Sequence, residues 1–381
     1  MSRAPGRRSV RQRQARGRSH VGERYDVVAG PIAHGGHVVA RVEGRAVFVR
    51  HALPGEQVLI EITEGTDGDR FWRADAISVA TPSPDRVEAP CPYAGPGRCG
   101  GCDFQHVALP AQRRLKADVV REQLARLAGL DLPVTVEAVP GDGPEMEAGL
   151  RWRTRQSYVG PGKGMRKHRS HDVIQVEDCL IAREDARTPG PGIVVEHVGE
   201  HAFEVAADGF WQVHPGAPAT LVDAVLEALD PRPGESVLDL YAGVGLFAAF
   251  LAERVGPSGR VVAIEGARRA SGLSAANVPA AEVAAGDVAA VLAQAYAERF
   301  DLVVLDPPRE GARRAVVEAV VARSPRAVAY VACDPAALAR DVAIFAEHGY
   351  GLERLRAFDL FPMTHHVECV ALLTKVGSDL H

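Results

Sequence analysis

The second half of the chain alternates short apolar runs with alanine-rich stretches, and this alternation limits the possible folds more than any other feature. From about residue 206 the apolar runs are SVLDL, RVVAIE, DLVVLD and AVAYVA, and helical stretches separate them. Short buried strands that alternate with helices are typical of a parallel sheet with helices on both faces. The pattern therefore predicts an α/β fold with a doubly wound, Rossmann-like sheet, in which ligands bind at the carboxyl ends of strands.

A glycine-rich turn, LDLYAGVGLFAAFLA, joins the first of these strands to a helix. Glycines let the backbone approach a ligand at a helix N-terminus. Gly243, Gly245 and Ala248 have the spacing of a dinucleotide-binding loop, and Glu265 lies where a ribose-binding acid is expected. The same loop suits S-adenosylmethionine, whose ribose also needs an acid at the end of the second strand. The glycines alone leave both cofactors open.

Two later strand ends carry polar residues. The stretch VVLDPPREG places Asp306 at the end of a strand, and the two prolines fix the backbone and remove two donors. Arg309 stands where methyltransferases that act on amino groups have an aromatic residue, which disfavours amino methylation. The stretch YVACDP places Cys333 at the end of the next strand. Its position alone also allows an inert, buried cysteine.

Four of the six cysteines form a pattern that indicates metal binding. Cys91, Cys99 and Cys102 have the spacing C-x7-C-x2-C, and Cys179 follows much later in VEDCL. In a cytoplasmic chain such clustering points to a metal rather than to disulfides. Four thiolates can hold zinc or a 4Fe-4S cluster. The long first gap and the remote fourth cysteine favour the 4Fe-4S cluster over zinc.

Composition and charge divide the chain into four expected parts. Residues 1–20 hold seven arginines and no acidic residue, which predicts a disordered basic arm that either attracts phosphates or is merely solvated. Residues 21–82 contain alternating β-like runs and predict a small OB-like β-barrel. Residues 83–205 form a central, cysteine-bearing domain with a helix from Pro110 to Leu130, and residues 206–381 form the α/β domain.

The stretch RWRTRQSYVGPGKGMRKHR, residues 151–169, holds seven basic residues and no acidic one. On a chain of net charge −5 it predicts a nucleic-acid track, in which basic groups hold phosphates while Trp152 and Tyr158 stack on bases. A solvated basic hairpin is the alternative. No apolar run approaches the ~18 residues of a membrane span, and no secretory signal is evident. We therefore expect a cytoplasmic protein, with a monomer as the default.

The stretches DLYAGVGLF, DPPREG, YVACDP and FPMTHHVECV resemble, in order and spacing, the RNA uracil-5 methyltransferase family. That family makes 5-methyluridine in tRNA and 23S rRNA. The resemblance covers nearly the whole chain, because VARVEGRAVFVRHALPGE is similar to the TRAM domain and the cysteine set resembles the 4Fe-4S site of cluster-bearing members. It implies a class I methyltransferase fold with an N-terminal TRAM barrel, S-adenosylmethionine as cofactor and RNA as partner.

The resemblance also implies roles for single residues. Cys333 matches the nucleophile and Glu368 matches the base. The residues that match the S-adenosylmethionine site are Gln212, Tyr241, Gly243, Gly245, Glu265, Asp287 and Asp306. Two positions depart from the family, because many members have Asn in place of Leu246 and Asn is frequent in place of His214.

The chemistry of uracil explains why a cysteine is needed. Carbon 5 is a poor nucleophile, and addition of a thiolate at C6 gives it the electron density to accept a methyl group. A base must then remove the C5 proton, and His365 and His366 are second choices to Glu368. Cys369 is expected to be a buried spectator, because neighbouring strand residues face opposite sides. The target base must be flipped out or already unpaired.

Two other functions remain open from the residues. One is a dinucleotide-dependent iron-sulfur oxidoreductase, which the glycine loop and the cysteines allow. The other is a non-catalytic RNA-binding protein that retains the fold, which the departure at Leu246 allows. The target uridine cannot be read from the chain, whether in tRNA or in 23S rRNA, because loop shape dominates such recognition.

Overall fold

The computed structural model describes residues 17–141 and 143–377. Internal contacts divide the chain into two units: one holds the residues up to Ala33 with His37–Arg86, and the other holds His34–Gly36 with the chain from Val87 onward. Most of the predicted basic arm, residues 1–16, lies outside the described residues. Its last residues are part of the first unit, where the amide of Arg18 and the ring of His20 bond to the carboxylate of Asp67.

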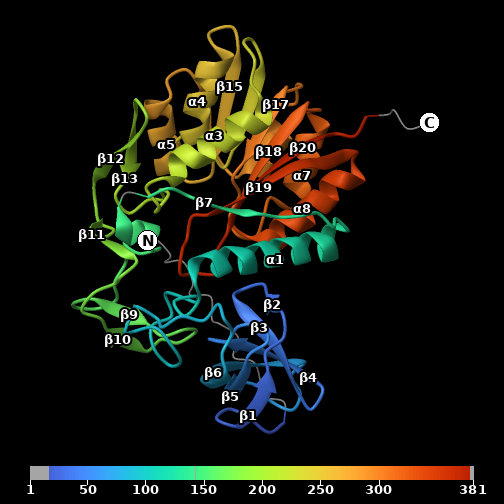
Figure 1. Ribbon diagram of the computed structural model, residues 1–381. Coiled ribbons are helices and arrows are strands. Elements are labelled where there is room, and N and C mark those ends of the chain that lie inside the picture. Colours follow the sequence, from blue (N-terminus) through green and yellow to red (C-terminus); the bar gives the residue numbers. More distant parts are fainter. Residues whose placement is uncertain (1–16, 142, 378–381) are drawn as a thin grey trace, which may run out of the picture. The chain divides into compact units, whose positions relative to one another are not determined.

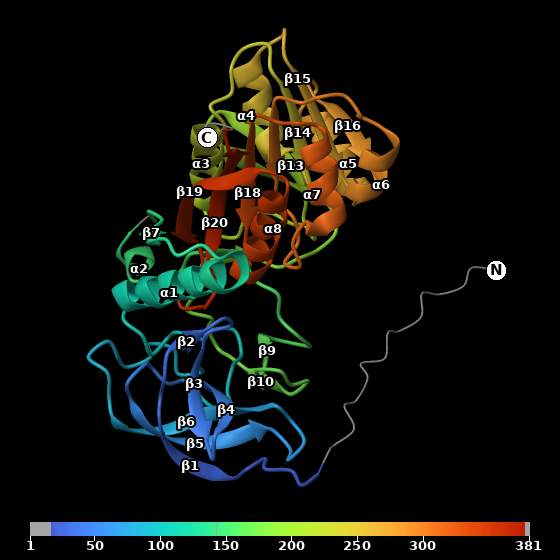
Figure 2. The ribbon, with the colours of Figure 1, turned by 90° about the vertical axis from the view of Figure 1, so that its right-hand side faces the viewer.

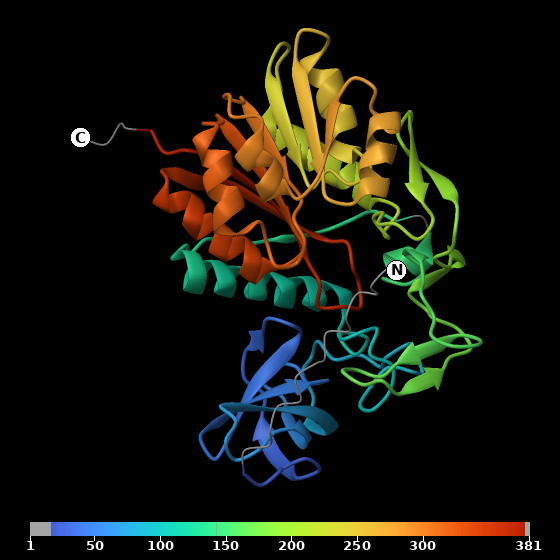
Figure 3. The ribbon, with the colours of Figure 1, turned by 180° about the vertical axis from the view of Figure 1, so that it is seen from behind.

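The first unit is a six-stranded β-barrel (blue in Figure 3), which confirms the barrel predicted from the sequence. Its strands have the sheet order β1-β5-β6-β4-β3-β2. Alternate residues of β3 and β4, among them Val38, Val47 and Val49, are buried inside the barrel. The strands are β1 (Arg24–Val28), β2 (Ile32–Ala33), β3 (His37–Val42), β4 (Arg45–Arg50), β5 (Gln57–Glu64) and β6 (Phe71–Thr81).

The second unit contains an eight-stranded sheet with the order β16-β15-β14-β17-β18-β20-β19-β7 (Figure 1). The strands from β16 to β18 run parallel to one another, and β20 is antiparallel to β18. The doubly wound sheet predicted from the alternating pattern is confirmed. The strands are β7 (Val136–Ala138), β14 (Ser236–Leu240), β15 (Arg260–Glu265), β16 (Glu282–Ala285), β17 (Leu302–Leu305), β18 (Ala327–Ala332), β19 (Tyr350–Asp359) and β20 (Glu368–Lys375).

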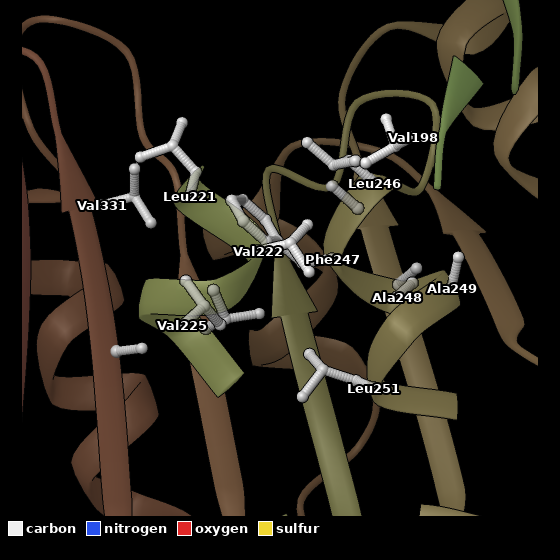
Figure 4. Packing of buried hydrophobic residues seen from close by; sticks show 14 of the residues in the cluster. Val198, Leu221, Val222, Val225, Leu246, Phe247, Ala248, Ala249, Leu251 and Val331 are labelled. Atoms are coloured by element: carbon white, nitrogen blue, oxygen red, sulfur yellow. The ribbon is translucent and has the colours of Figure 1, made fainter. Parts of the chain in front are cut away.

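Helices cover both faces of this sheet, and each face has its own apolar core. One core holds α3 (Ala217–Leu229), α4 (Leu246–Val255) and α5 (Arg268–Asn277). Figure 4 shows its packing, in which Phe247 of α4 lies beside Val222 of α3 and Leu246 lies near Val198. The other core holds α1 (Leu109–Ala128), α6 (Val288–Gln294), α7 (Arg313–Ala322) and α8 (Pro335–Glu347). None of the described helices is both long and apolar enough to cross a bilayer.

Part of the cysteine-bearing segment belongs to the large sheet. The predicted helix at Pro110–Leu130 is confirmed as α1, which packs beside α8 (Figure 2). β7 pairs in parallel with β19, and Val120, Leu124 and Val136 share the core of that face. Of the segments 83–205 and 206–381, expected as separate domains, all residues from Val87 onward fall within one unit. The remaining elements are α2 (Pro144–Glu147), β8 (Arg153–Arg155), β9 (Gly164–Arg166), β10 (Val173–Gln175), β11 (Ala182–Arg187), β12 (Ile193–Val198) and β13 (His201–Ala206).

Candidate active site and four-cysteine cavity

The strand order brings most of the predicted site residues to one edge of the sheet. β14, β15, β17 and β18 run in parallel, so their carboxyl ends lie together. Tyr241 follows β14, Glu265 ends β15, Asp306 follows β17 and Cys333 follows β18. Glu368 starts the antiparallel strand β20 at this same edge.

The pairing register places Cys333 next to Glu368. In the antiparallel pair β18 and β20, Ala332 lies opposite Cys369, so the residue after Ala332 faces the residue before Cys369. Glu368 is only 3% exposed, and Cys333 is half-buried. Cys369 is fully buried, as predicted for a spectator. The tertiary fold thus joins a thiol and a carboxyl that are 35 positions apart in the chain.

Burial controls the protonation of both groups. Burial, together with the nearby carboxylate of Glu368, raises the pKa of Cys333 to about 12. Burial, together with Asp306, raises the pKa of Glu368 well above its usual range. The guanidinium of Arg309 lowers the pKa of both groups. Arg309 is therefore the cation that favours a thiolate and a carboxylate at this place.

Two histidines lie near the thiol. Cys333 opens into a cavity that is also lined by Arg309, His365 and His366. Burial and the nearby positive groups lower the pKa of His366 to about 3, so its ring is neutral and weakly basic. The Nδ1 atom of His365 lies 2.5 Å from an oxygen of Asp103, which fixes the orientation of that ring.

The glycine-rich turn after β14 has the shape of a ligand cradle. Tyr241, Gly243 and Gly245 all have positive φ angles, of 64°, 57° and 92°. A Cβ atom at Gly245 would lie 2.8 Å from a methyl of Val278, whereas a Cβ at Gly243 would meet nothing within 4 Å. Gly245 therefore permits close packing of the helix, and Gly243 leaves open space above the turn. The turn is closed by Glu265, whose Oε2 accepts a hydrogen bond from the Gly243 amide at 2.9 Å.

Three carboxyl groups gather beneath this turn. Asp239 is fully buried, and its Oδ2 accepts from the Ala248 amide at 2.9 Å, while its Oδ1 has no hydrogen-bond partner among the described residues. Burial raises the pKa of Asp239 to about 8, and burial with Glu265 nearby raises the pKa of Asp306 to about 7. Such a cluster is relieved by a cation. The ammonium and sulfonium groups of S-adenosylmethionine are cations of this kind, so the residues fit that cofactor.

Sequence reasoning missed Asp239, although a signal was present. A carboxylate inside the apolar run SVLDL breaks the pattern of a buried strand, and buried carboxylates are uncommon unless they serve a site. The hydrophobic residues of the run account for the strand but not for this carboxylate. Asp239 therefore adds a buried carboxyl beside the predicted residues Asp306 and Glu265.

The remaining predicted residues lie in different surroundings. Gln212 is buried in the loop between β13 and α3, next to Trp211, which packs on Phe203. Asp287 is exposed and caps α6 by accepting from the Ala290 amide at 3.0 Å. Leu246 is buried in the apolar core at the start of α4 (Figure 4), where an Asn side chain would be surrounded by hydrocarbon.

The four predicted cluster cysteines line one cavity of about 260 Å³. All of them are half-buried, and the Gly101 amide donates to the sulfur of Cys99 at 3.4 Å. Arg153 lines the same cavity. Within residues 17–141 and 143–377, no group of three or more His, Cys, Asp or Glu side chains is placed to hold a single metal ion. Cys91, Cys99, Cys102 and Cys179 therefore share one cavity, although they come from two segments far apart in the chain.

The prediction of a nucleic-acid track at residues 151–169 is wrong for its first part. Trp152 is only 1% exposed and packs against His214 and Phe361, so its ring cannot stack on a base. Arg151 is bonded to Asp178 within the fold. The Trp152 side chain points inward because burial of its large apolar ring in this cluster is more favourable in free energy than exposure to water. The exposed basic residues of the segment are Lys163, Arg166 and Arg169.

Comparison with known proteins finds matches for both units of the chain. Residues 197–376 match the tRNA (Uracil-5-)-methyltransferase family, and residues 18–76 match the TRAM domain. An uncharacterized RNA methyltransferase of Streptomyces avermitilis is 45% identical, with 94% of this chain and 100% of the relative aligned. Another, from Streptomyces coelicolor, is 44% identical, with 95% of each chain aligned.

A solved structure has the same fold. The tRNA (uracil-54, C5)-methyltransferase of Pyrococcus abyssi, determined with S-adenosyl-L-homocysteine, superposes with a TM-score of 0.68 over 92% of this chain and 99% of that one. The sequence identity is 20%, so the likeness shows the fold. The family match and the relatives named as RNA methyltransferases decide against the oxidoreductase and against a non-catalytic protein. The chain belongs to the tRNA (uracil-5-)-methyltransferase family of S-adenosylmethionine-dependent RNA methyltransferases and carries a TRAM domain at its N-terminus.

Proposed function

We propose that this enzyme forms 5-methyluridine in RNA through a covalent bond between Cys333 and carbon 6 of the target uracil. The observation that carries the proposal is the register of β18 and β20, which sets Cys333 beside the buried Glu368. A thiol next to a carboxyl at the ligand-binding edge of the sheet has the groups that both halves of the reaction need.

The steps assigned to the chain follow from its charges. The Cys333 thiol loses its proton to solvent, and Arg309 favours the resulting thiolate, which attacks C6 and leaves a negative enolate on the base. S-adenosylmethionine supplies the methyl group that C5 accepts. Glu368, ionised with the help of Arg309, then takes the C5 proton, and elimination restores the ring and returns the electron pair to the sulfur of Cys333.

The cofactor is assigned to the turn after β14 and to the carboxyl cluster below it. Gly243 leaves room for the ligand, Glu265 offers a carboxylate for the ribose, and the Asp239 and Asp306 carboxyls favour its positive end. The other residues proposed for this site are Gln212, Tyr241, Gly245 and Asp287. The exposure of Asp287 leaves it accessible to an adenine ring, although its capping bond occupies one oxygen.

The cavity of Cys91, Cys99, Cys102 and Cys179 is proposed to hold a 4Fe-4S cluster. A zinc ion needs its sulfurs about 2.3 Å from one point. A cubane instead takes one thiolate at each of four separate iron atoms, and four cysteines that line one cavity offer that number of thiolates. Arg153 on the cavity wall offers a positive charge opposite the thiolates. The cluster is proposed to stabilise the fold, and no step of the reaction passes through it.

The RNA is proposed to be tRNA or 23S rRNA. The barrel and the exposed basic residues of the β9–β10 hairpin, Lys163 and Arg166, are candidates for phosphate contacts. The Pyrococcus abyssi enzyme of the same fold is named for a uracil in tRNA, which makes tRNA the first RNA to test. Mapping 5-methyluridine in tRNA and 23S rRNA from cells with and without the gene identifies the target.

Two variants test the covalent mechanism. Glu368→Gln leaves addition and methyl transfer possible but removes the proton acceptor, so a methylated uridine remains bonded to Cys333. On a denaturing gel this variant, given labelled S-adenosylmethionine and total RNA from cells lacking the gene, produces a slow, labelled band that nuclease removes. Cys333→Ala produces no such band and no methylation. Methylation by Cys333→Ala would contradict the proposal. Near-normal turnover by Glu368→Gln would show that another group removes the C5 proton.

A further inference from the structure

The loop between β19 and β20, residues 360–367, leads directly into Glu368 and is held from outside itself. The main-chain oxygen of Met363 accepts hydrogen bonds from the amides of both Asp103 and Phe104, each at 3.0 Å. The Met363 amide donates to Oε1 of Gln112 on α1 at 2.8 Å. The loop therefore takes its shape from the segment that follows the cysteines and from α1.

Met363 shows why this support matters. Its φ angle is 66°, a left-handed conformation that a residue with a side chain adopts at a cost of about 1 kcal/mol. Such a conformation persists only where surrounding contacts impose it. Here three hydrogen bonds from two other segments meet at one residue, five positions before the proposed base Glu368.

Asp103 adds a side-chain contact to these backbone bonds. It follows Cys102 directly, and its Oδ2 lies 2.5 Å from Nδ1 of His365 and 3.4 Å from the His365 amide. The Asp103 side chain is 11% exposed and that of His365 is 28% exposed, so solvent screens the pair only partly. His365 in turn lines the cavity onto which Cys333 opens.

We propose that Asp103 is a positioning residue, which ties the four-cysteine segment to the loop before Glu368 through its bond to His365. The proposal rests on the proposed function only in taking Glu368 as a group whose position affects the rate. The cysteine segment then has a second role besides holding the cluster. It must be folded correctly for the loop before Glu368 to keep its position in the active site.

The test compares Asp103→Ala, His365→Ala and the double variant with the wild type. Asp103→Ala lowers kcat roughly tenfold to a hundredfold, as expected for a shift of about 1 Å in a catalytic group, and leaves the KM for S-adenosylmethionine within about twofold. The double variant is no slower than the slower single variant, because both changes remove the same contact. Asp103→Asn, which keeps an oxygen to accept from the ring, recovers part of the loss.

Two further measurements separate positioning from loss of the fold or of the cluster. Asp103→Ala retains its iron, and its amide hydrogens at residues 361–367 exchange faster, while those of the turn after β14 are unchanged. Asp118→Ala, on the exposed side of α1, is the matched control and changes none of these values. Methylation is measured as methyl incorporated into total RNA from cells lacking the gene, so the result does not depend on the covalent mechanism.

The proposal is overturned by an unchanged kcat in Asp103→Ala, by additive effects in the double variant, or by unchanged exchange at residues 361–367. It is also overturned if Asp103→Ala loses its iron and its activity in proportion, because Asp103 would then act only by supporting the cluster. Failure of the covalent mechanism is recognised separately, by methylation in Cys333→Ala.

Discussion

Cys333 and Glu368 lie in surroundings that disfavour their charged forms, although the proposed reaction needs each charge at a different moment. Burial raises the pKa of both groups, and the nearby carboxylates add to the effect on the thiol. Arg309 is the group that opposes this trend. The Cys333 thiol therefore stays protonated at neutral pH unless the balance between the nearby carboxylates and Arg309 changes.

This balance predicts how Cys333 reacts with an alkylating agent. With a pKa of about 12, the thiolate fraction rises about tenfold for each pH unit, so the alkylation rate keeps rising from pH 7 to pH 9. Arg309→Ala slows the reaction further, because the cation that lowers the pKa is gone. Mass spectrometry of the Cys333 peptide measures the rate, and Arg314→Ala, on α7 beside Glu347, is the control for loss of one arginine. A rate that levels off near pH 8 would contradict the raised pKa.

Asp239 predicts a pH dependence of stability. Burial raises its pKa from 3.8 to about 8, so the folded state binds the proton more tightly than the unfolded state. The stability from this group is fully present below pH 4 and is lost as the pH rises through 8. Asp239→Asn does not titrate, so its melting temperature relative to the wild type increases between pH 4 and pH 8. Thermal unfolding at several pH values checks this, and Asp223→Asn, exposed on α3, shows no such trend.

At the scale of the element, the turn between β14 and α4 combines two glycines with different tasks. Gly245 lets α4 pack closely on Ser274 and Val278, whereas Gly243 borders open space. The two positions share a positive φ angle, so a side chain costs about 1–2 kcal/mol in backbone strain at either one. They differ only in what the added carbon meets.

This difference predicts that the two alanine variants lose different properties: Gly245→Ala mainly stability and Gly243→Ala mainly ligand binding. Gly245→Ala adds a clash with Val278 at 2.8 Å, which costs a further ~1–3 kcal/mol, so its unfolding midpoint falls more than that of Gly243→Ala. Gly243→Ala fills space proposed for the cofactor, so its affinity for S-adenosylhomocysteine falls although its stability falls less than that of Gly245→Ala. Denaturant unfolding and calorimetric titration measure the two effects. Equal stability in the two variants would contradict the packing assigned to Gly245.

At the scale of the whole molecule, the second unit combines a methyltransferase sheet with a cysteine-bearing segment that contributes α1 and β7 to it. A buried ion pair joins the two parts, because Nζ of Lys116 on α1 lies 2.5 Å from a carboxylate oxygen of Asp359 at the end of β19. Removal of one partner from such a pair costs about 3–5 kcal/mol. The sheet and the segment that holds the cysteines are therefore expected to unfold together.

The proposed cluster gives the prediction at this scale. Protein purified without oxygen is brown and contains about four iron atoms per chain. Cys179→Ser removes one ligand at the cavity, so the iron content falls and the colour is lost. Cys369→Ala, a buried cysteine of β20 outside the cavity, keeps both. Iron assay and the visible spectrum are the measurements, and one zinc per chain in place of iron would contradict the assignment.

The architecture and the residues at the strand ends could be predicted before the structure was known. Parallel strands separated by helices gather their carboxyl ends at one edge, so the order of the motifs is enough to place Tyr241, Glu265, Asp306 and Cys333 together. The cysteine spacing likewise indicated a shared site, and the structure places those four cysteines around one cavity. These features are local patterns, and once the fold class is known it follows where their residues lie in space.

Which polar and aromatic groups are buried depends instead on packing between distant segments. The basic neighbours of Trp152 predict a base-stacking residue, yet its ring is buried against segments far along the chain. Asp103 and His365, 262 positions apart, meet only because the loop before Glu368 packs on the segment after the cysteines. Such contacts depend on which side chains face each other after packing. Hydrophobic periodicity does not record this, because it reports burial along one element and not the partner across it.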